Sequence, residues 1–239
     1  MSLSIRNLRL LVMGVWAAFL AWLLISDNVL RYLGPHTVWV VKFGAVGLTL
    51  ATIAYAWVSQ GGADERAAVT RSQAAGLVAL LLPVAIGFMM SNVSLGALAA
   101  SNKLASRGVD MAELARSLAS GSDEVSFLQI AGAGKDSSLR SEYGLKEGSS
   151  VAVTGLVMKP SSTPKGTFEL GRFYITCCIA DALPVSVPVD PKLIGGGPYQ
   201  ENQWLTVDGV LDSSGQGFEI EATEIKPIPQ PKDPYLSFK

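Results

Sequence analysis

Long apolar runs before residue 102 are the feature that most limits what this chain can fold into. Hydrophobic residues make up 49% of the 239 residues, and they are concentrated in this first part. In a lipid bilayer, backbone hydrogen bonds are satisfied within helices or closed barrels, and uncharged runs near twenty residues favour helices. We therefore expect a transmembrane helical region at residues 1–102, followed by a structure of another kind.

Three membrane spans are predicted in this region. The first is the uncharged run Leu10–Ile25, and the second extends from about Thr37 to Val58. The third has its core at Ala74–Met90 and is interrupted by Pro83, which removes a backbone donor and can kink a helix. Three spans place the two ends of the chain on opposite sides of a membrane.

A cleaved signal peptide is the alternative interpretation of the first span. Arg6 and Arg9 precede the apolar run, as they would in a signal peptide. No small-x-small cleavage site follows in residues 25–31, and two further apolar spans come later. We therefore expect an uncleaved anchor in the cell membrane, in contact with lipid.

Basic residues near the spans give the expected orientation. The two sets that would face opposite sides are nearly balanced: Arg6, Arg9, Arg66 and Arg71 on one side, and Arg31, Lys42, Lys103 and Arg107 on the other. The side richer in Lys and Arg is usually cytoplasmic. We expect a cytoplasmic N-terminus and a C-terminal domain on the exported side.

The second part of the chain, residues 103–239, is mildly acidic. It contains thirteen Lys and Arg against seventeen Asp and Glu. Binding to a phosphate backbone favours a basic surface with interleaved aromatic residues, so we expect no nucleic-acid partner. The length is sufficient to bury one hydrophobic core.

Residues 103–148 are predicted to connect the membrane region to a β domain. Helical spacing of apolar residues over Lys103–Ser120 indicates a short amphipathic helix that ends near Gly121. A strand is predicted at Glu124–Ile130, followed by a Gly- and Ser-rich connection with one helical turn around Leu139–Tyr143.

A small all-β domain is predicted at residues 149–226. Its five segments rich in Val, Ile, Thr and aromatic residues are Val151–Met158, Thr167–Cys178, Leu183–Val189, Trp204–Leu211 and Phe218–Ile225. Five short strands separated by turn residues are typical of an OB-like barrel. Gly155 and Gly209 would permit the bulges and sharp coiling that a small barrel needs. Residues 227–239 are Pro-rich and predicted to form an extended tail.

The chain has only two cysteines, Cys177 and Cys178, and they are adjacent. On a regular strand their side chains point to opposite faces, so both could reach one metal ion only if the strand breaks. Asp181 could then accept backbone hydrogen bonds in a turn or supply an oxygen ligand. Thiolates bind Zn²⁺ or Cu⁺, but a closed zinc site takes four ligands, and the only histidine, His36, lies far away in the sequence. A buried structural pair, a metal contact and a redox pair therefore remain open.

Arg172 has two interpretations. The simplest is an ion pair with a carboxylate such as Asp181 or Glu169 on the barrel surface, and the other is recognition of an anionic ligand. The sequence contains no nucleophile elbow, phosphate loop or histidine-based metal motif. We therefore expect a protein that is not an enzyme.

Two motifs, Arg172-Phe-x-Ile-x-Cys-Cys-x-Ala-Asp181-Ala and Trp204-Leu-x-Val-x-Gly209, give the chain a resemblance to the YcgQ-like family of bacterial permease subunits. The family is also described as a subunit of a two-component membrane permease complex. The three spans, Tyr32-x-x-Pro35, and Leu82-Pro83 with the following Gly87 also fit this pattern, so the resemblance covers nearly the whole chain.

The resemblance implies an accessory subunit beside a separate polytopic permease, of a class that includes proteins assigned to metal or organoarsenical transport. Cys177, Cys178 and Asp181 are then the matched positions that would touch cargo or partner, and Arg172 lies in the same motif. The chain departs from many relatives in having few histidines after the second span, which weakens a metal-collecting role there. The alternative is a membrane-tethered thiol redox or metal-relay protein that acts through Cys177 and Cys178.

Overall fold

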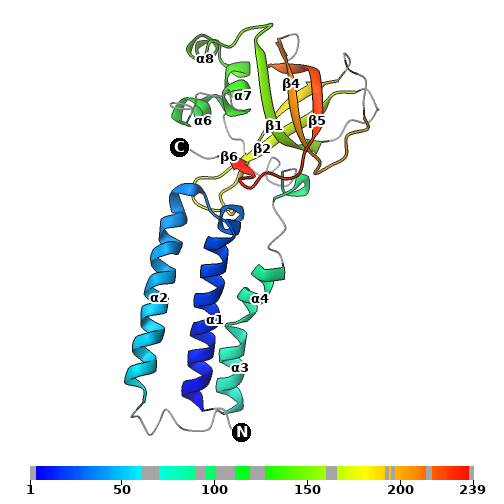
Figure 1. Cartoon of the computed structure of the whole chain (residues 1–239). Helices are drawn as coiled ribbons and strands as arrows, with labels where there is room; N and C mark the ends of the chain where they lie inside the picture. Colours follow the sequence, from blue (N-terminus) through cyan, green and yellow to red (C-terminus); the bar gives the residue numbers. More distant parts are fainter. Residues whose placement is uncertain are drawn as a thin grey trace. The chain divides into compact units, whose positions relative to one another are not determined.

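The computed structural model describes residues 4–60, 70–89, 95–100, 111–118, 127–159, 166–191, 194, 197–213 and 217–236. The chain divides into two compact units, Met1–Val93 and Ser94–Lys239 (Figure 1).

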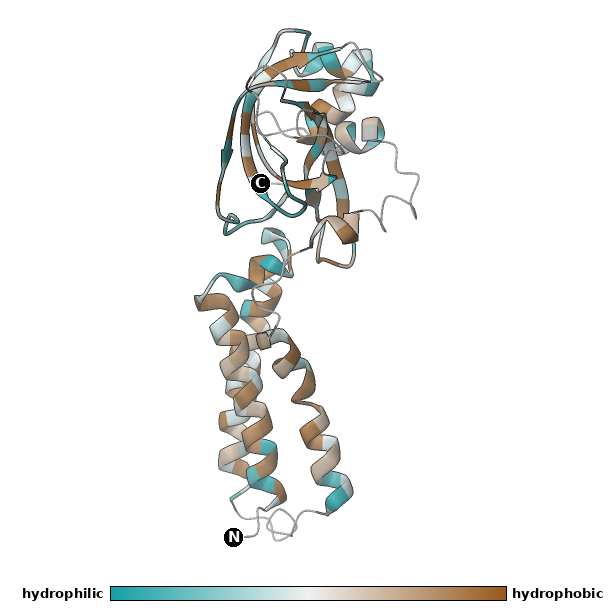
Figure 2. Cartoon of the chain, turned by 90° about the vertical axis from the view of Figure 1, so that its right-hand side faces the viewer, coloured by the Kyte–Doolittle hydropathy of each residue, from teal (hydrophilic) through white to brown (hydrophobic). Residues whose placement is uncertain are grey.

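The N-terminal unit is helical. Its elements are α1 (Ile5–Ile25), the 3-10 helices η1 (Asn28–Arg31) and η2 (Pro35–Thr37), α2 (Val38–Val58), α3 (Arg71–Ala79) and α4 (Leu82–Met89). Among the described residues, three helical stretches, Ile5–Ile25, Pro35–Val58 and Arg71–Met89, are long and apolar enough to cross a membrane. Hydrophobic residues cover most of their length (Figure 2). The prediction of three spans is confirmed.

The third span is interrupted near Pro83, as predicted. α3 ends at Ala79 and α4 begins at Leu82, so Pro83 lies in the first turn of α4, where its missing N–H costs little. The indole Nε1 of Trp16 donates a hydrogen bond to the Leu80 carbonyl oxygen at 3.0 Å. A side chain of α1 thus satisfies a backbone acceptor at the break.

In its described residues, the C-terminal unit begins with a helical turn at residues 97–100. The elements that follow are α6 (Met111–Leu118), α7 (Phe127–Lys135), α8 (Ser137–Glu142), β1 (Ser150–Lys159), β2 (Phe168–Tyr174), β3 (Leu183–Asp190), β4 (Trp204–Asp212), β5 (Glu219–Pro227) and β6 (Tyr235–Leu236). α6 lies within the predicted amphipathic helix, and α8 matches the predicted helical turn. Residues 103–110 and 119–121 lie outside the described residues.

The predicted strand at Glu124–Ile130 is wrong. Residues 124–126 lie outside the described part, and Phe127–Lys135 forms the helix α7. Most of its residues are buried, so it lacks the polar face that gives a helix its periodic signal. Gly134 permits the close packing, because a Cβ there would lie 2.8 Å from the backbone nitrogen of Phe218.

The strands form one mixed sheet in the order β1-β4-β5-β3-β2-β6, with a further pairing between β1 and β2. Each of β1 to β5 therefore has two neighbours among these five strands. The β3–β5 pairing is parallel and short, and joins Val189 to Ile220 and Asp190 to Glu221. The other pairings among β1 to β5 are antiparallel.

Glycines allow the strands to approach closely at two crossings. The register of β4 and β5 shifts between Asp208 and Gly209, where Asp208 faces Glu224 and Gly209 faces Ala222, so the extra residue lies on β5 opposite Gly209. A Cβ on Gly155 would lie 2.7 Å from the carbonyl oxygen of Gly171, while the register shift of β1 falls later, between Val157 and Lys159. Gly155 thus permits a close approach of β1 to β2 rather than a bulge.

The buried residues of the C-terminal unit form two clusters. The main cluster packs α7 against the inner face of the sheet and includes Phe127, Val157 and Phe168. The second cluster consists of Ala100, Leu156, Met158, Phe173, Ile175, Ala182, Trp204 and Tyr235. Leu156 and Val157 are consecutive in β1 and belong to different clusters, so the clusters lie on opposite faces of that strand.

Asp136 caps the N-terminus of α8, and its ionised carboxylate contributes stability that depends on pH. Its carboxylate accepts hydrogen bonds from the Ser138 backbone nitrogen at 2.8 Å and the Ser138 hydroxyl at 2.7 Å, and it pairs with Arg116. The hydrogen bonds from Ser138 and Arg116 lower the pKa of Asp136 to about 2.

The stability that this carboxylate contributes is present above its unfolded pKa near 3.9 and is lost as the pH falls toward 2. We expect Asp136→Asn to lower the melting temperature by on the order of 1–3 °C at pH 7, because the pair is exposed and asparagine also caps helices. Thermal unfolding should show the difference shrinking between pH 4 and pH 2. A difference that is constant with pH would contradict this assignment.

Candidate functional site

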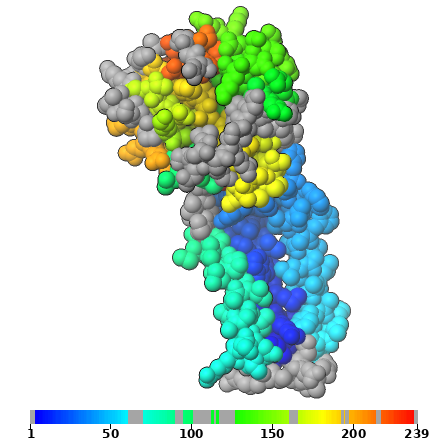
Figure 3. All heavy atoms as spheres, turned by 180° about the vertical axis from the view of Figure 1, so that it is seen from behind, coloured from blue at the N-terminus to red at the C-terminus, as the bar shows by residue number. Residues whose placement is uncertain are grey.

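The Cys loop, defined as residues 175–182, joins β2 to β3. β2 ends at Tyr174, so the prediction that the strand continues to Cys178 is wrong. The alternation of side chains between two faces therefore does not apply to the cysteines. Cys177 is exposed and Cys178 is partly buried, and residues of this region reach the surface of the C-terminal unit (yellow in Figure 3).

The carboxylate of Asp181 holds the Cys loop in a compact turn. It accepts hydrogen bonds from the backbone nitrogens of Thr176 at 3.2 Å and Cys177 at 2.8 Å. The Asp181 backbone nitrogen donates in turn to the Cys178 carbonyl oxygen at 3.1 Å. Of the two roles considered for Asp181, the structure shows the turn-capping one.

The same carboxylate controls the protonation of Cys177. A side-chain hydrogen bond to Asp181, and a second to Cys178, raise the pKa of Cys177 to about 11. Partial burial by itself would raise the pKa of Asp181. Hydrogen bonds from the Cys177 thiol and from the loop backbone outweigh this effect and lower the pKa of Asp181 below its usual value. At neutral pH the Cys177 thiol is therefore a neutral donor to a charged carboxylate, which makes it a weak nucleophile.

The side chains of Cys177, Cys178 and Asp181 come together, and the cysteines do not form a disulfide. Within the described ranges, however, no group of three His, Cys, Asp or Glu residues is placed to hold a metal ion. The three residues therefore do not fit a metal centre by themselves, and the expected metal site has no support in the geometry.

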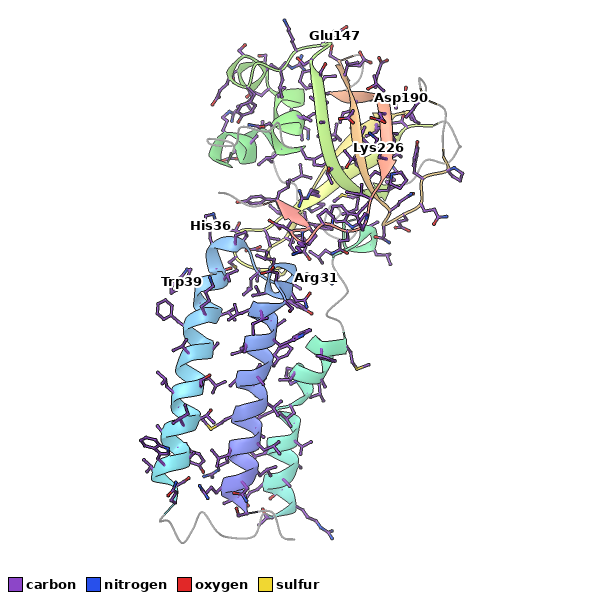
Figure 4. All side chains as sticks on the ribbon, in the orientation of Figure 1. Arg31, His36, Trp39, Glu147, Asp190 and Lys226 are labelled. Atoms are coloured by element: carbon purple, nitrogen blue, oxygen red, sulfur yellow. The ribbon has the colours of Figure 1, made fainter. Side chains whose placement is uncertain are left out.

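His36 lies in η2, at the start of the second membrane span, and its side chain is exposed (Figure 4).

Arg172 holds the C-terminal tail. Its guanidinium donates hydrogen bonds to the carbonyl oxygens of Asp233, Pro234 at 3.2 Å and Tyr235 at 3.1 Å. It also lies 5.9 Å from the centre of the Trp204 ring, within the range of a cation–π contact.

The predicted ion pair of Arg172 with Asp181 or Glu169 is wrong. Glu169 lies three residues before Arg172 on β2, so their side chains project from opposite faces. Glu169 accepts instead from the Ser186 hydroxyl at 2.8 Å. Asp181 lies beyond the end of the strand and is engaged in the Cys loop.

Several residues around this site were missed from the sequence. The Asn202 side chain accepts a hydrogen bond from the Ala97 backbone nitrogen at 2.7 Å, and the Tyr235 hydroxyl accepts one from the Leu95 backbone nitrogen at 3.3 Å. Tyr235 pairs with Phe173 in the short parallel ladder between β6 and β2. The one feature of the sequence that could have pointed to these contacts is Tyr235, an aromatic residue within a Pro-rich polar tail.

Three apolar helices followed by this sheet unit define a membrane-anchored protein with a C-terminal β unit. Residues 139–237 match the family model of the DUF1980 C-terminal domain, over a stretch that begins within α8 and includes β1 to β6. The matched stretch includes Arg172 and the Cys loop. No curated protein and no solved structure matches the chain.

Proposed function

We propose that the protein is an accessory subunit of a two-component membrane permease complex. Its three helices would dock against a polytopic permease, and the β unit would contact that partner through the Cys loop. The observation that carries the proposal is a preformed, exposed loop in which Asp181 keeps Cys177 as a neutral thiol. Such a loop is suited to binding a partner more than to nucleophilic chemistry.

An OB-like barrel is the fold that we propose for the β unit. The pairings run β1-β4-β5-β3-β2 and return to β1, and β3 and β5 are parallel. OB folds are five-stranded, partly open barrels that serve as recognition modules. Thirteen Lys and Arg against seventeen Asp and Glu in residues 103–239 favour a protein partner over a nucleic acid.

The proposal includes a metal-related cargo for the partner and a position of the β unit on the exported side of the membrane. A metal-related cargo for the partner rests on the family resemblance alone. The exported position of the β unit rests on the balance of basic residues beside the three spans.

Co-purification tests the complex. The chain should be extracted in a mild detergent after expression with the proteins encoded beside it, and we expect a polytopic permease to co-elute in a fixed ratio. Ala180→Arg, on the exposed part of the Cys loop, should weaken this association, while Ser141→Arg on the exposed face of α8 should not. A chain that remains solitary, with its C-terminal unit folded, would refute the proposal.

A membrane-tethered thiol redox or metal-relay protein is the second candidate. The contact between the Cys177 and Cys178 side chains favours it, and the raised pKa of Cys177 opposes it. Alkylation kinetics and metal titration of the full chain separate the two candidates. A rapidly reacting thiol or stoichiometric metal uptake would favour the second, whereas slow alkylation without metal uptake would remove it.

A further inference from the structure

Three segments that are distant in the sequence meet in the second cluster of the C-terminal unit. They are residues 95–100, which follow the last membrane span, the Cys loop, and the tail that ends in β6. We propose that the tail is a strap that holds residues 95–100 and the Cys loop on one face of the sheet. The proposal concerns contacts within one unit, so it stands independently of the permease partner.

The strap is fastened at β2. Arg172 on this strand binds three consecutive carbonyl groups of residues 233–235, and hydrogen bonds that involve a charged group are about twice as strong as neutral ones. β6 adds to β2 in parallel, and the Ile175 backbone nitrogen donates to the Leu236 carbonyl oxygen at 3.1 Å. The tail thus lies beside the part of β2 where the pairing of β2 with β1 has ended.

Residues 95–100 contact both the strap and the turn before β4, which contains Asn202. Tyr235 is 3% exposed, and its hydroxyl accepts the hydrogen bond from the Leu95 backbone nitrogen. Ala100, which is 1% exposed, packs in the same cluster. Gly96 lies close to this contact, and a Cβ there would lie 2.5 Å from the Asn202 side-chain oxygen, so a larger residue would displace the Asn202 side chain.

Both ends of the Cys loop depend on the same cluster. Ile175 and Ala182 flank the cysteines, each is 1% exposed, and both pack with Tyr235 in the second cluster. Asp181 closes the turn itself, but Ile175 and Ala182, at the two ends of the loop, pack against the strap. Removing the tail would therefore loosen the loop and residues 95–100 together, because each loses part of the same apolar surface.

Hydrogen exchange of the full chain in detergent micelles tests the strap. We expect Arg172→Ala to accelerate amide exchange by at least about tenfold in both residues 95–100 and residues 175–182. Arg140→Ala is the matched control. Arg140 also donates to two carbonyl oxygens, of Ala133 at 2.7 Å and Gly134 at 3.1 Å, and lies 4.8 Å from an aromatic centre, that of Phe218, but it belongs to α8.

The control variant should accelerate exchange in α7 and leave the two strapped segments unchanged. The proposal is overturned if folded Arg172→Ala leaves either segment unchanged, or if Arg140→Ala accelerates both to the same extent. Should Arg172→Ala fail to fold, a chain ended after Lys232 gives the same comparison. Misfolding of that shortened chain as well would show that the tail is part of the core and not a strap.

Discussion

Replacing Gly171 with alanine is expected to destabilise the C-terminal unit strongly. A Cβ at this position would lie 2.2 Å from the Val185 carbonyl oxygen and 2.8 Å from the Ser186 Cα, both in β3. β2 cannot move away from β3, because it also pairs with β1 at this residue, where Leu156 faces Gly171. Backbone atoms cannot rotate aside as a side chain can, so neighbouring strands must separate.

We expect a loss of more than about 3 kcal/mol, the upper end for overpacking, from a total that is on the order of 5–15 kcal/mol for a domain. Protease resistance of the full chain in increasing urea measures it, because the C-terminal unit can be followed separately from the helices. Gly217→Ala is the control, since the nearest atom to its added Cβ is at an ordinary 3.7 Å. Equal urea midpoints for the two variants would show that the strand crossing is not as tight as described.

Replacing Asp181 with asparagine is expected to make Cys177 reactive. The carboxylate is the largest cause that raises the pKa of Cys177 to about 11, against an ordinary value of 9.0. A return toward the ordinary value would increase the thiolate fraction at pH 8 by up to about 100-fold. Because a thiolate of lower pKa is also less nucleophilic, the rate with a disulfide reagent should rise by about tenfold.

The dependence of the Cys177 reaction rate on pH shows in which direction the pKa of the thiol has changed. The reactivity of the parent protein should still be rising at pH 10, whereas that of Asp181→Asn should level off about two pH units earlier. Both chains should carry Cys178→Ser, so that one thiol is followed. Glu224→Gln, which removes an exposed carboxylate on β5, should leave the rate unchanged. Identical profiles for parent and Asp181→Asn would mean that the carboxylate does not hold the thiol.

The sequence by itself determined the two-part organisation and most of the strands. The three spans follow from composition, because a bilayer selects long uncharged helices whatever their packing. β1, β3, β4 and β5 follow from β-rich residues between turns, because local propensity and half-buried faces agree there. Pro83 marked the helix break, because the missing N–H acts within one turn of the chain.

Tertiary structure alone decided α7, the end of β2 and the partners of Arg172. α7 is buried on nearly all sides, so its sequence has no polar face by which to tell a helix from a strand. The strand ends at Tyr174 because Asp181 folds the following residues into a turn. Arg172 binds carbonyl groups more than sixty residues away, and backbone acceptors leave no mark in a sequence. The candidate residues could therefore be recognised from the sequence as a motif. The thiol chemistry of Cys177 and the contact of Arg172 with the tail could be seen only in the folded chain.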